Sequence, residues 1–264
     1  MIRLTDVTLC PGGEPVVEDV SWHIHAKEHV GLVGRNGSGK TTVLRAIAKE
    51  LSPDRGKVLL REGASVGYLP QQAVADTSQT VWDEARTGMV RLNQLGKTLD
   101  AAQLAVDEDR PGAIERHAEA MEVFRVAGGF SQEETIGSVL YGLGFAKTDW
   151  QRPCSTFSGG WQMRIALARL LLAQPDVALL DEPTNHLDLA ARTWLAHFLS
   201  RAPFTVVVVA HDRHLLDQVA TRIAEVHMNE VHHYTGNFTA FLRQRRERRE
   251  QQLGLYKRQQ KEIV

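Results

Sequence analysis

The sequence predicts an α/β domain built on a mostly parallel sheet, and three observations lead to this prediction. Residues 177–180 and 206–210 are entirely apolar, as strands are when both faces of a sheet are covered. Segments with helical spacing separate these runs, which is typical of parallel strands joined by helices. Residues from about 73 to 154 lose the strand signals and are rich in helix formers, which indicates a helical insertion in the α/β core.

The composition is that of an ordinary soluble domain. Hydrophobic residues make up 43% and charged residues 24% of the 264 residues, and the net charge is −1. This charge does not predict a polyanionic partner for the chain as a whole, although a local basic patch remains open. Cys10 and Cys154 lack metal-type spacing, no signal peptide follows Met1, and no apolar run has the length of a membrane span. We therefore expect a cytoplasmic location and no membrane contact.

The individual elements follow from apolar patterning and turn residues. Strands are expected at residues 2–9, 16–24, 29–33, 58–60, 66–69, 177–180 and 205–210. Core helices are expected at residues 41–51, 158–172 and 190–199 and after His211, and insertion helices at residues 81–99, 99–106 and 112–126.

Residues 34–41 match the phosphate-loop pattern G-x-x-x-x-G-K-[ST]. An apolar strand precedes the loop and a helix follows it, so a chance match in a glycine-rich turn is the weaker alternative. Lys40 is expected to reach the β- and γ-phosphates, and Thr41 to bind Mg²⁺. The residues expected to bind the nucleotide here are Gly34, Asn36, Gly37, Ser38, Gly39, Lys40, Thr41 and Thr42.

Two carboxylates follow the apolar strand at residues 177–180. Strand ends of this kind lie at the ligand-binding edge of an α/β sheet. Asp181 is expected to hold Mg²⁺ and Glu182 to act as the general base that polarises the attacking water. His211 follows the next apolar strand and is expected to sense the γ-phosphate. Gln71 follows the strand at residues 66–69, and we expect it to contact both Mg²⁺ and the water.

Ser158, Gly159 and Gly160 open another helix. Backbone amides at a helix N-terminus and the serine hydroxyl can bind a phosphate. On its own the tripeptide is a weak signal, because Ser-Gly-Gly is also an ordinary loop.

The order of these motifs resembles an ATP-binding cassette over residues 1–240. The resemblance implies a P-loop core with an antiparallel β subdomain, ATP and Mg²⁺ as cofactors, and ATPase activity. It also assigns Asp188 to nucleotide binding, together with Ser158, Gly159 and Gly160. In such cassettes the phosphate loop of one copy and the signature serine of another enclose each ATP. A lone cassette is therefore expected to hydrolyse ATP weakly.

Three segments resemble the ABC-F proteins, which act on ribosomes. They are Asp-Glu-Pro-Thr-Asn-His-Leu-Asp at residues 181–188, Phe-Ser-Gly-Gly-Trp-Gln-Met-Arg at residues 157–164, and Tyr-Thr-Gly-Asn-Phe at residues 234–238. The family implies two cassettes joined by a helical linker that reaches toward the peptidyl-tRNA. Residues 241–264 would then begin this linker. The expected partners are a second cassette of the same protein or a head-to-tail copy, and the ribosome and tRNA.

Several alternatives stay open at this stage. A transporter's nucleotide-binding subunit and a DNA-associated ABC-F relative are rival functions, and the resemblance does not separate routine translation from stalled-ribosome rescue or antibiotic resistance. The arginines between residues 243 and 249 suit RNA contact, or else form a solvated helix face. Cys10 and Pro11 stand where cassettes place an adenine-stacking aromatic, which weakens the expected preference for ATP over GTP.

The remaining histidines and aromatics have simpler interpretations. His23, His25 and His29 share a strand face but lack a completing ligand, so we expect an ordinary strand surface rather than a metal site. Residues His227, His232 and His233 are interpreted in the same way. Trp194 and Phe198 lie at helical spacing and are expected to belong to the core.

Overall fold

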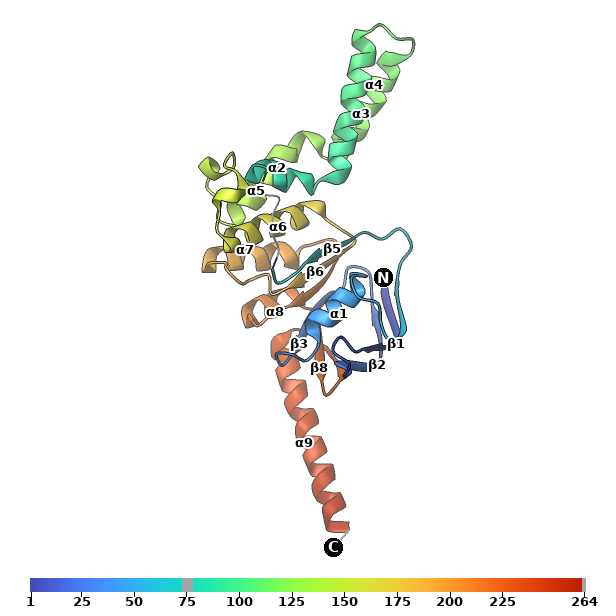
Figure 1. Cartoon of the computed structure of the whole chain (residues 1–264), viewed down its shortest axis with the longest axis vertical. Helices are drawn as coiled ribbons and strands as arrows, with labels where there is room; N and C mark the ends of the chain where they lie inside the picture. The colour runs from blue at the N-terminus through green and yellow to red at the C-terminus, as the bar shows by residue number, and fades with distance from the viewer. Residues whose placement is uncertain (73–77, 263–264) are drawn as a thin grey trace. The chain divides into compact units, whose positions relative to one another are not determined.

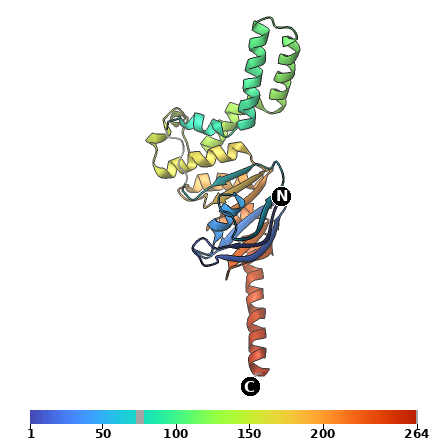
Figure 2. The same cartoon turned by 45° about the vertical axis from the view of Figure 1, so that its right-hand side comes forward.

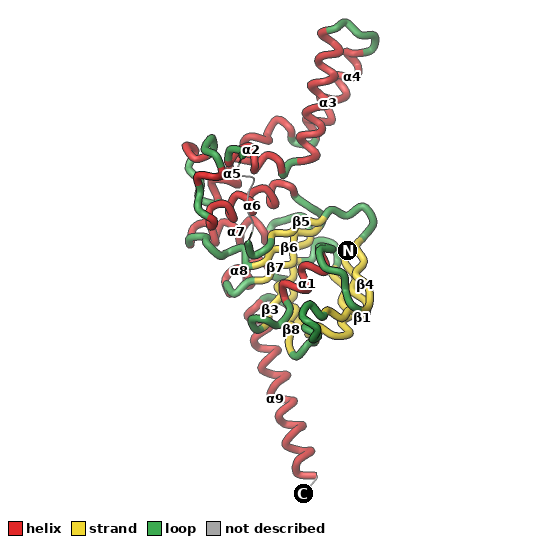
Figure 3. The backbone as a smooth tube through the Cα atoms, viewed as in Figure 1, coloured by secondary structure: helices red, strands yellow, loops and turns green. Residues whose placement is uncertain are grey.

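The computed structural model describes residues 1–72 and 78–262, with only the backbone path given beyond residue 251. The chain forms two compact units. An α/β unit comprises Met1–Gln71, Asp176–Thr184 and the residues from Arg192 onward, and a helical unit comprises Gln72–Pro175 and Asn185–Ala191. Figure 3 shows that the strands of the described chain all belong to the α/β unit.

The main sheet of the α/β unit has the strand order β5-β6-β7-β3-β8-β9. Its strands are β3 (His29–Gly34), β5 (Val66–Leu69), β6 (Val177–Asp181), β7 (Thr205–Val209), β8 (Arg222–His227) and β9 (Glu230–Thr235). All neighbouring pairs are parallel except β8 with β9. Every residue of β6 and β7 is buried, in agreement with their continuous apolar sequence. Since β6, β7 and β3 are adjacent, the residues that follow them meet at one edge of the sheet.

A second, antiparallel sheet has the order β2-β1-β4. Its strands are β1 (Ile2–Leu9), β2 (Val17–Ile24) and β4 (Arg55–Leu60). Helix α1 (Lys40–Ile47) packs against β1 of this sheet and against β3, β6 and β7 of the main sheet. Val43, Leu44 and Ile47 of α1 are buried in the shared core. This burial on two sides fixes α1, and with it the loop that precedes α1 (Figure 1).

Three more helices complete the α/β unit: α7 (Leu189–Ser200), whose first three residues group with the helical unit, α8 (Arg213–Val219) and α9 (Phe238–Glu262). The start of α9 is attached to the unit at two places. Phe241 packs edge-on against Tyr234 of β9, with ring centroids 4.9 Å apart. Thr239 donates two hydrogen bonds to Asp217 of α8, from its backbone N–H at 2.7 Å and its hydroxyl at 2.8 Å. From this root α9 extends away from the sheets (Figures 1 and 2).

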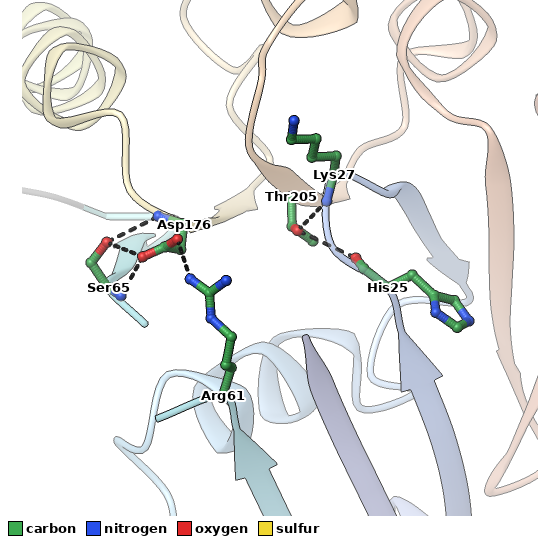
Figure 4. Close-up of polar contacts among 6 residues, drawn as sticks. All are labelled: His25, Lys27, Arg61, Ser65, Asp176 and Thr205. Carbon is green, nitrogen blue, oxygen red and sulfur yellow. Dashed lines mark hydrogen bonds and ion pairs between the residues drawn. The ribbon is translucent and has the colours of Figure 1, made fainter. Parts of the chain in front are cut away.

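Polar side chains join the segments at the amino ends of the parallel strands (Figure 4). Asp176 accepts hydrogen bonds from Arg61 at 2.7 Å and from the N–H and hydroxyl of Ser65, both at 3.0 Å. The Ser65 N–H is the main reason why the pKa of Asp176 lies below its ordinary value. The buried Thr205 hydroxyl accepts from the Lys27 N–H at 2.9 Å and donates to the His25 carbonyl at 3.3 Å. These contacts connect the segments that enter the parallel strands, at the edge of the sheet opposite the phosphate loop.

The helical unit contains α2 (Val81–Thr87), α3 (Val90–Asp107), α4 (Ala113–Val126), α5 (Gln132–Gly142) and α6 (Gly159–Ala173), with 3₁₀ turns at Gly129–Ser131, Lys147–Asp149 and Cys154–Thr156. Helices α3 and α4 form an antiparallel hairpin, visible in Figures 1 and 2. Helices α2 and α5 pack on α6. The unit thus reaches past residue 154, and α6 is its central helix. No helix of the described chain has the length and apolar character needed to cross a bilayer.

One local expectation from the sequence is wrong, and one strand pair was not foreseen. A helix boundary was expected at Leu99, but α3 runs through that residue and the break lies at Gly88 and Met89. A side chain at Gly88 would collide with the Arg169 carbonyl of α6, so the close packing of α2 on α6 requires glycine at this position. The antiparallel pair β8 and β9 was also not assigned. Helix α9 is continuous from Phe238, so residue 241 lies in its first turn.

Candidate nucleotide-binding site

The phosphate loop connects β3 to α1 and adopts a conformation that requires glycine. Gly37 and Gly39 have φ values of 78° and 99°, in the left-handed region that other residues rarely occupy. A Cβ atom at Gly39 would lie 3.0 Å from the Cβ of Val16. Nothing lies within 4 Å of the corresponding position at Gly37, so the backbone there is open to a ligand.

Lys40 begins α1 and is 9% exposed. Its ammonium group donates to the carbonyls of Gly34 at 3.0 Å and Arg35 at 2.8 Å. Burial lowers the pKa of Lys40, while the carboxylates of Glu182 and Asp181 oppose this shift. The nearby Ser38 hydroxyl is buried and has no hydrogen-bond partner within the described part of the chain. A buried cation held only by carbonyl dipoles, next to an unpartnered hydroxyl, suits an incoming phosphate group.

Thr41 and Asp181 form a pair that could hold Mg²⁺. The Thr41 hydroxyl donates to Oδ2 of Asp181 at 2.7 Å, so the two oxygen donors are already side by side. Asp181 is 1% exposed, and burial raises its pKa against the opposing effects of Thr41 and Lys40. A hydroxyl and a carboxylate fit the oxygen preference of Mg²⁺, which takes its other ligands from phosphates and water.

Glu182 directly follows β6 and is 6% exposed. Its backbone has a φ of 53°, and its N–H donates to the Val209 carbonyl at 2.9 Å. Such a conformation in a non-glycine residue is costly and concentrates at functional sites. Burial raises the pKa of the Glu182 carboxyl, and His211 opposes the shift. A raised pKa makes the carboxylate a stronger proton acceptor, as a general base requires.

His211 is the closest partner of Glu182. Its Nε2 lies 3.3 Å from Oε1 of Glu182, and its backbone N–H donates to Oε2 at 3.4 Å. The imidazole itself is largely exposed. Gln71 follows β5, and its side chain and that of Asn36 are exposed, whereas Thr42 is half-buried.

The signature residues lie in the other compact unit. Ser158 precedes α6 and is exposed together with Gly159, so the first amides of this helix are accessible. A Cβ atom at Gly160 would lie 3.0 Å from the Cβ of His186, which explains the need for glycine. Asp188 accepts hydrogen bonds from the Ala191 N–H at 2.9 Å and from Arg164 at 3.2 Å, and these contacts lower its pKa in that order.

Arg164 is a residue to which the sequence pattern gave no role. Its guanidinium is 7% exposed and lies over the Trp161 ring, 4.3 Å from the centroid. It also donates to the carbonyls of His186 and Leu143. Arg164 thereby holds the segment 185–188 against α6. A charged residue on an apolar helix, six residues after Ser158, was the sequence signal that could have indicated such a role.

The α/β unit therefore gathers the phosphate loop, Asp181, Glu182 and His211, while Ser158, Gly159, Gly160 and Asp188 belong to the helical unit. The sequence profile of a family described as ABC transporter matches residues 17–185, and a second profile with the same description matches residues 224–264. The chain belongs to the ABC transporter family.

Relatives of this ABC transporter chain include proteins named as ABC transporter F family members and others named as ATP-binding proteins. It is 34% identical to ABC transporter F family member 5 of Arabidopsis thaliana, over 99% of this chain and 39% of that protein. It is 35% identical to YdiF of Bacillus subtilis, over 100% of this chain and 42% of that protein. YheS of Haemophilus influenzae is 34% identical over 100% of this chain and 40% of that protein. The chain thus spans about two fifths of these relatives, the length of one ABC cassette.

Solved structures of ABC cassettes share the fold. A dimeric cassette described as a post-hydrolysis state with ADP and phosphate superposes with a TM-score of 0.63 at 23% identity, covering 89% of this chain and 98% of that one. An ATP-binding subunit of an ABC transporter superposes with a TM-score of 0.66 at 17% identity, covering 89% of this chain and 90% of that one. The prediction of a mostly parallel α/β sheet with an antiparallel sheet and inserted helices is confirmed.

Replacing Lys40 tests the phosphate loop directly. Lys40→Ala should weaken Mg-ATP binding by about 10- to 150-fold, since a hydrogen bond to a charged group contributes about 1.5–3 kcal/mol. Isothermal titration calorimetry measures the dissociation constant. Lys57→Ala, which removes an exposed lysine from β4, is the control and should leave the affinity unchanged. Equal affinities for the two variants would mean that phosphates bind elsewhere.

Proposed function

We propose that this chain is the Mg-ATP-hydrolysing cassette of an F-type ABC protein that acts on the ribosome in the cytoplasm. The ATPase proposal rests on three features at one edge of the main sheet: a buried cation, a hydroxyl–carboxylate pair and a second buried carboxylate. Lys40 and Thr41 begin the helix that follows β3, and Asp181 and Glu182 lie at the end of β6. Only β7 separates β3 from β6 in the sheet.

Each of these residues has one task in the proposed reaction. The loop amides and Lys40 bind the phosphates, and Thr41 and Asp181 hold Mg²⁺, which neutralises phosphate charge when bound. Glu182 orients and deprotonates the attacking water. His211, 3.3 Å from Glu182, positions that carboxylate and reaches the γ-phosphate. Gln71 contributes a further contact to Mg²⁺ and the water.

A second cassette completes the site in this proposal. The exposed N-terminus of α6, with Ser158 and Gly159, is suited to the γ-phosphate of an ATP bound to a facing cassette. The facing cassette would be the second one of the same protein, since the chain spans only about two fifths of its relatives, or another copy of this chain. Closure on ATP and release after hydrolysis would then form the switch.

The proposal of a ribosomal target rests on the basic helix α9. Arg243, Arg245, Arg246, Arg248 and Arg249 fall within two turns and are exposed. Arginine clusters of this kind bind RNA phosphates with strong salt dependence. Relatives named as F family members over the same region add to this proposal.

The role of Glu182 is tested by Glu182→Gln. The variant should bind Mg-ATP normally and hydrolyse it about 10²- to 10⁴-fold more slowly, the usual effect of losing a general base. Single-turnover hydrolysis is measured at the protein concentration of highest specific activity. Glu62→Gln, at an exposed site, serves as the control. Turnover by Glu182→Gln at the control rate would refute the assignment.

The need for a second cassette predicts that specific activity rises with concentration. A monomer of residues 1–264 should be nearly inactive, because a missing electrostatic donor costs about 2.7–4 kcal/mol. Ser158→Arg should abolish the concentration-dependent activity, whereas Ser155→Arg, in the nearby exposed turn, should not. Rates are measured with light scattering at each concentration. Fast turnover by a proven monomer that tolerates Ser158→Arg would show a site complete in one chain.

Ribosome binding is tested by cosedimentation over a salt series. Reversing Arg246, Arg248 and Arg249 to Glu should weaken binding and flatten the dependence of log K on log salt by about 0.7–0.9 for each phosphate that the variant no longer binds. Reversal of Arg3, Arg91 and Arg201, exposed elsewhere, is the matched control. If both triple variants bind equally, α9 is a solvated helix. Preferential displacement by branched DNA would instead favour a DNA-associated function.

A further inference from the structure

A basic hollow of about 470 Å³ lies at the root of α9, within the α/β unit. Its lining includes Arg35 of the phosphate loop and four arginines of α9: Arg245, Arg246, Arg248 and Arg249. At about 100° per residue these four positions occupy one side of the helix, whereas Arg243 lies on the other side. Segments more than 200 residues apart in sequence thus place guanidinium groups around one concave surface.

The charges in this hollow are only partly compensated. Glu225 is the one carboxylate among the described residues that line it, and it is 5% exposed. It accepts from Nε of Arg245 at 2.9 Å and from the Tyr234 hydroxyl at 3.1 Å. Arg246 bonds to Glu250 at 3.0 Å. Arg245 and Arg246 are therefore neutralised by acids.

Three guanidinium groups remain. Arg35, Arg248 and Arg249 form no ion pair with any carboxylate whose side chain the structure describes, and all three are exposed. The imidazole of His232 also lines the hollow, and burial followed by the charge of Arg248 lowers its pKa. The Arg248 side chain also interacts with that of Tyr234, but no described acid pairs with it. The hollow therefore carries an excess of positive charge.

The hollow continues toward the phosphate loop. A second cavity of about 440 Å³ shares Arg35, Glu225 and Arg245 with the first and extends to Lys40 and His211. The carbonyl of Arg35 accepts a hydrogen bond from the Lys40 ammonium at 2.8 Å. A ligand that binds the Arg35 side chain would thus contact the residue whose backbone holds Lys40.

We propose that this hollow binds consecutive phosphates of an RNA strand, with Arg35 of the phosphate loop as part of the RNA site. Planar guanidinium groups bind phosphate oxygens in pairs, and three such groups without an acid partner, from two segments, suit a strand better than a single small anion. The proposal rests on the proposed function in taking RNA as the ligand of α9. It adds that the strand contacts the nucleotide-binding loop itself.

Fluorescence anisotropy with a labelled 12-nucleotide single-stranded RNA tests the site on residues 1–264. Arg35→Ala and Arg249→Ala should each weaken binding about tenfold, as expected for one charge-assisted phosphate contact, and reduce the salt slope by about 0.7. Arg201→Ala, at an exposed position outside the hollow and outside α9, is the matched control and should change the affinity less than about twofold. Arg35→Lys should restore part of the affinity, which separates a charge effect from a misfolded loop.

The outcomes separate this inference from the ribosomal proposal. Equal losses for Arg201→Ala and Arg249→Ala, or normal RNA affinity for Arg35→Ala, would overturn the hollow as a site and leave ribosome binding by α9 standing. Displacement of the RNA by millimolar inorganic phosphate at constant ionic strength would show a single-anion site and overturn the strand proposal. Normal hollow-dependent RNA binding without ribosome cosedimentation would overturn the ribosomal proposal alone.

Discussion

The 2.7 Å hydrogen bond between Thr41 and Asp181 joins the two halves of the candidate site. One partner belongs to α1 and the other ends β6, so the phosphate loop is fixed to the sheet beside it. This contact depends on the burial of α1 between two sheets, which leaves the helix little freedom to shift. Burial also disfavours the charged forms of Lys40, Asp181 and Glu182, and the attraction between the ammonium and the two carboxylates offsets this effect. The chain thus concentrates opposite charges where a charged ligand is expected.

Much of the candidate site at this edge of the main sheet could be predicted from the sequence, because each of its parts has a local sequence signal. The glycines at 37 and 39 mark the loop, and the largely apolar strands β6 and β7 place Asp181 at the end of one and His211 two residues after the other. Local signals work there because each strand is buried throughout and its end is therefore fixed. The contact of His211 with Glu182 could not be predicted, since the parallel order β6-β7 that brings them together depends on pairing between distant segments.

The features that escaped prediction depend on tertiary packing. The lack of a side chain at Gly88 lets α6 approach α2 closely, and nothing in the sequence around residue 88 reveals that approach. Strands β8 and β9 carry histidines and charged residues in place of an apolar run, so their pairing was hidden. Glu225 lies on β8 among these residues, and its burial beside Arg245 is evident only once α9 is seen to pack against β9.

The continuity of α9 has a mechanical consequence. Its 25 residues span roughly 37 Å at about 1.5 Å per residue. The first turn is held by Thr239 on α8 and by Phe241 against β9, so a change in the orientation of these elements is passed to the whole helix. Because a straight α-helix resists bending, a tilt of about 10° at the root would move the far end by roughly 6 Å over that length. A small tilt of the sheet would thus be enlarged along the helix into a displacement of about the size of a nucleotide.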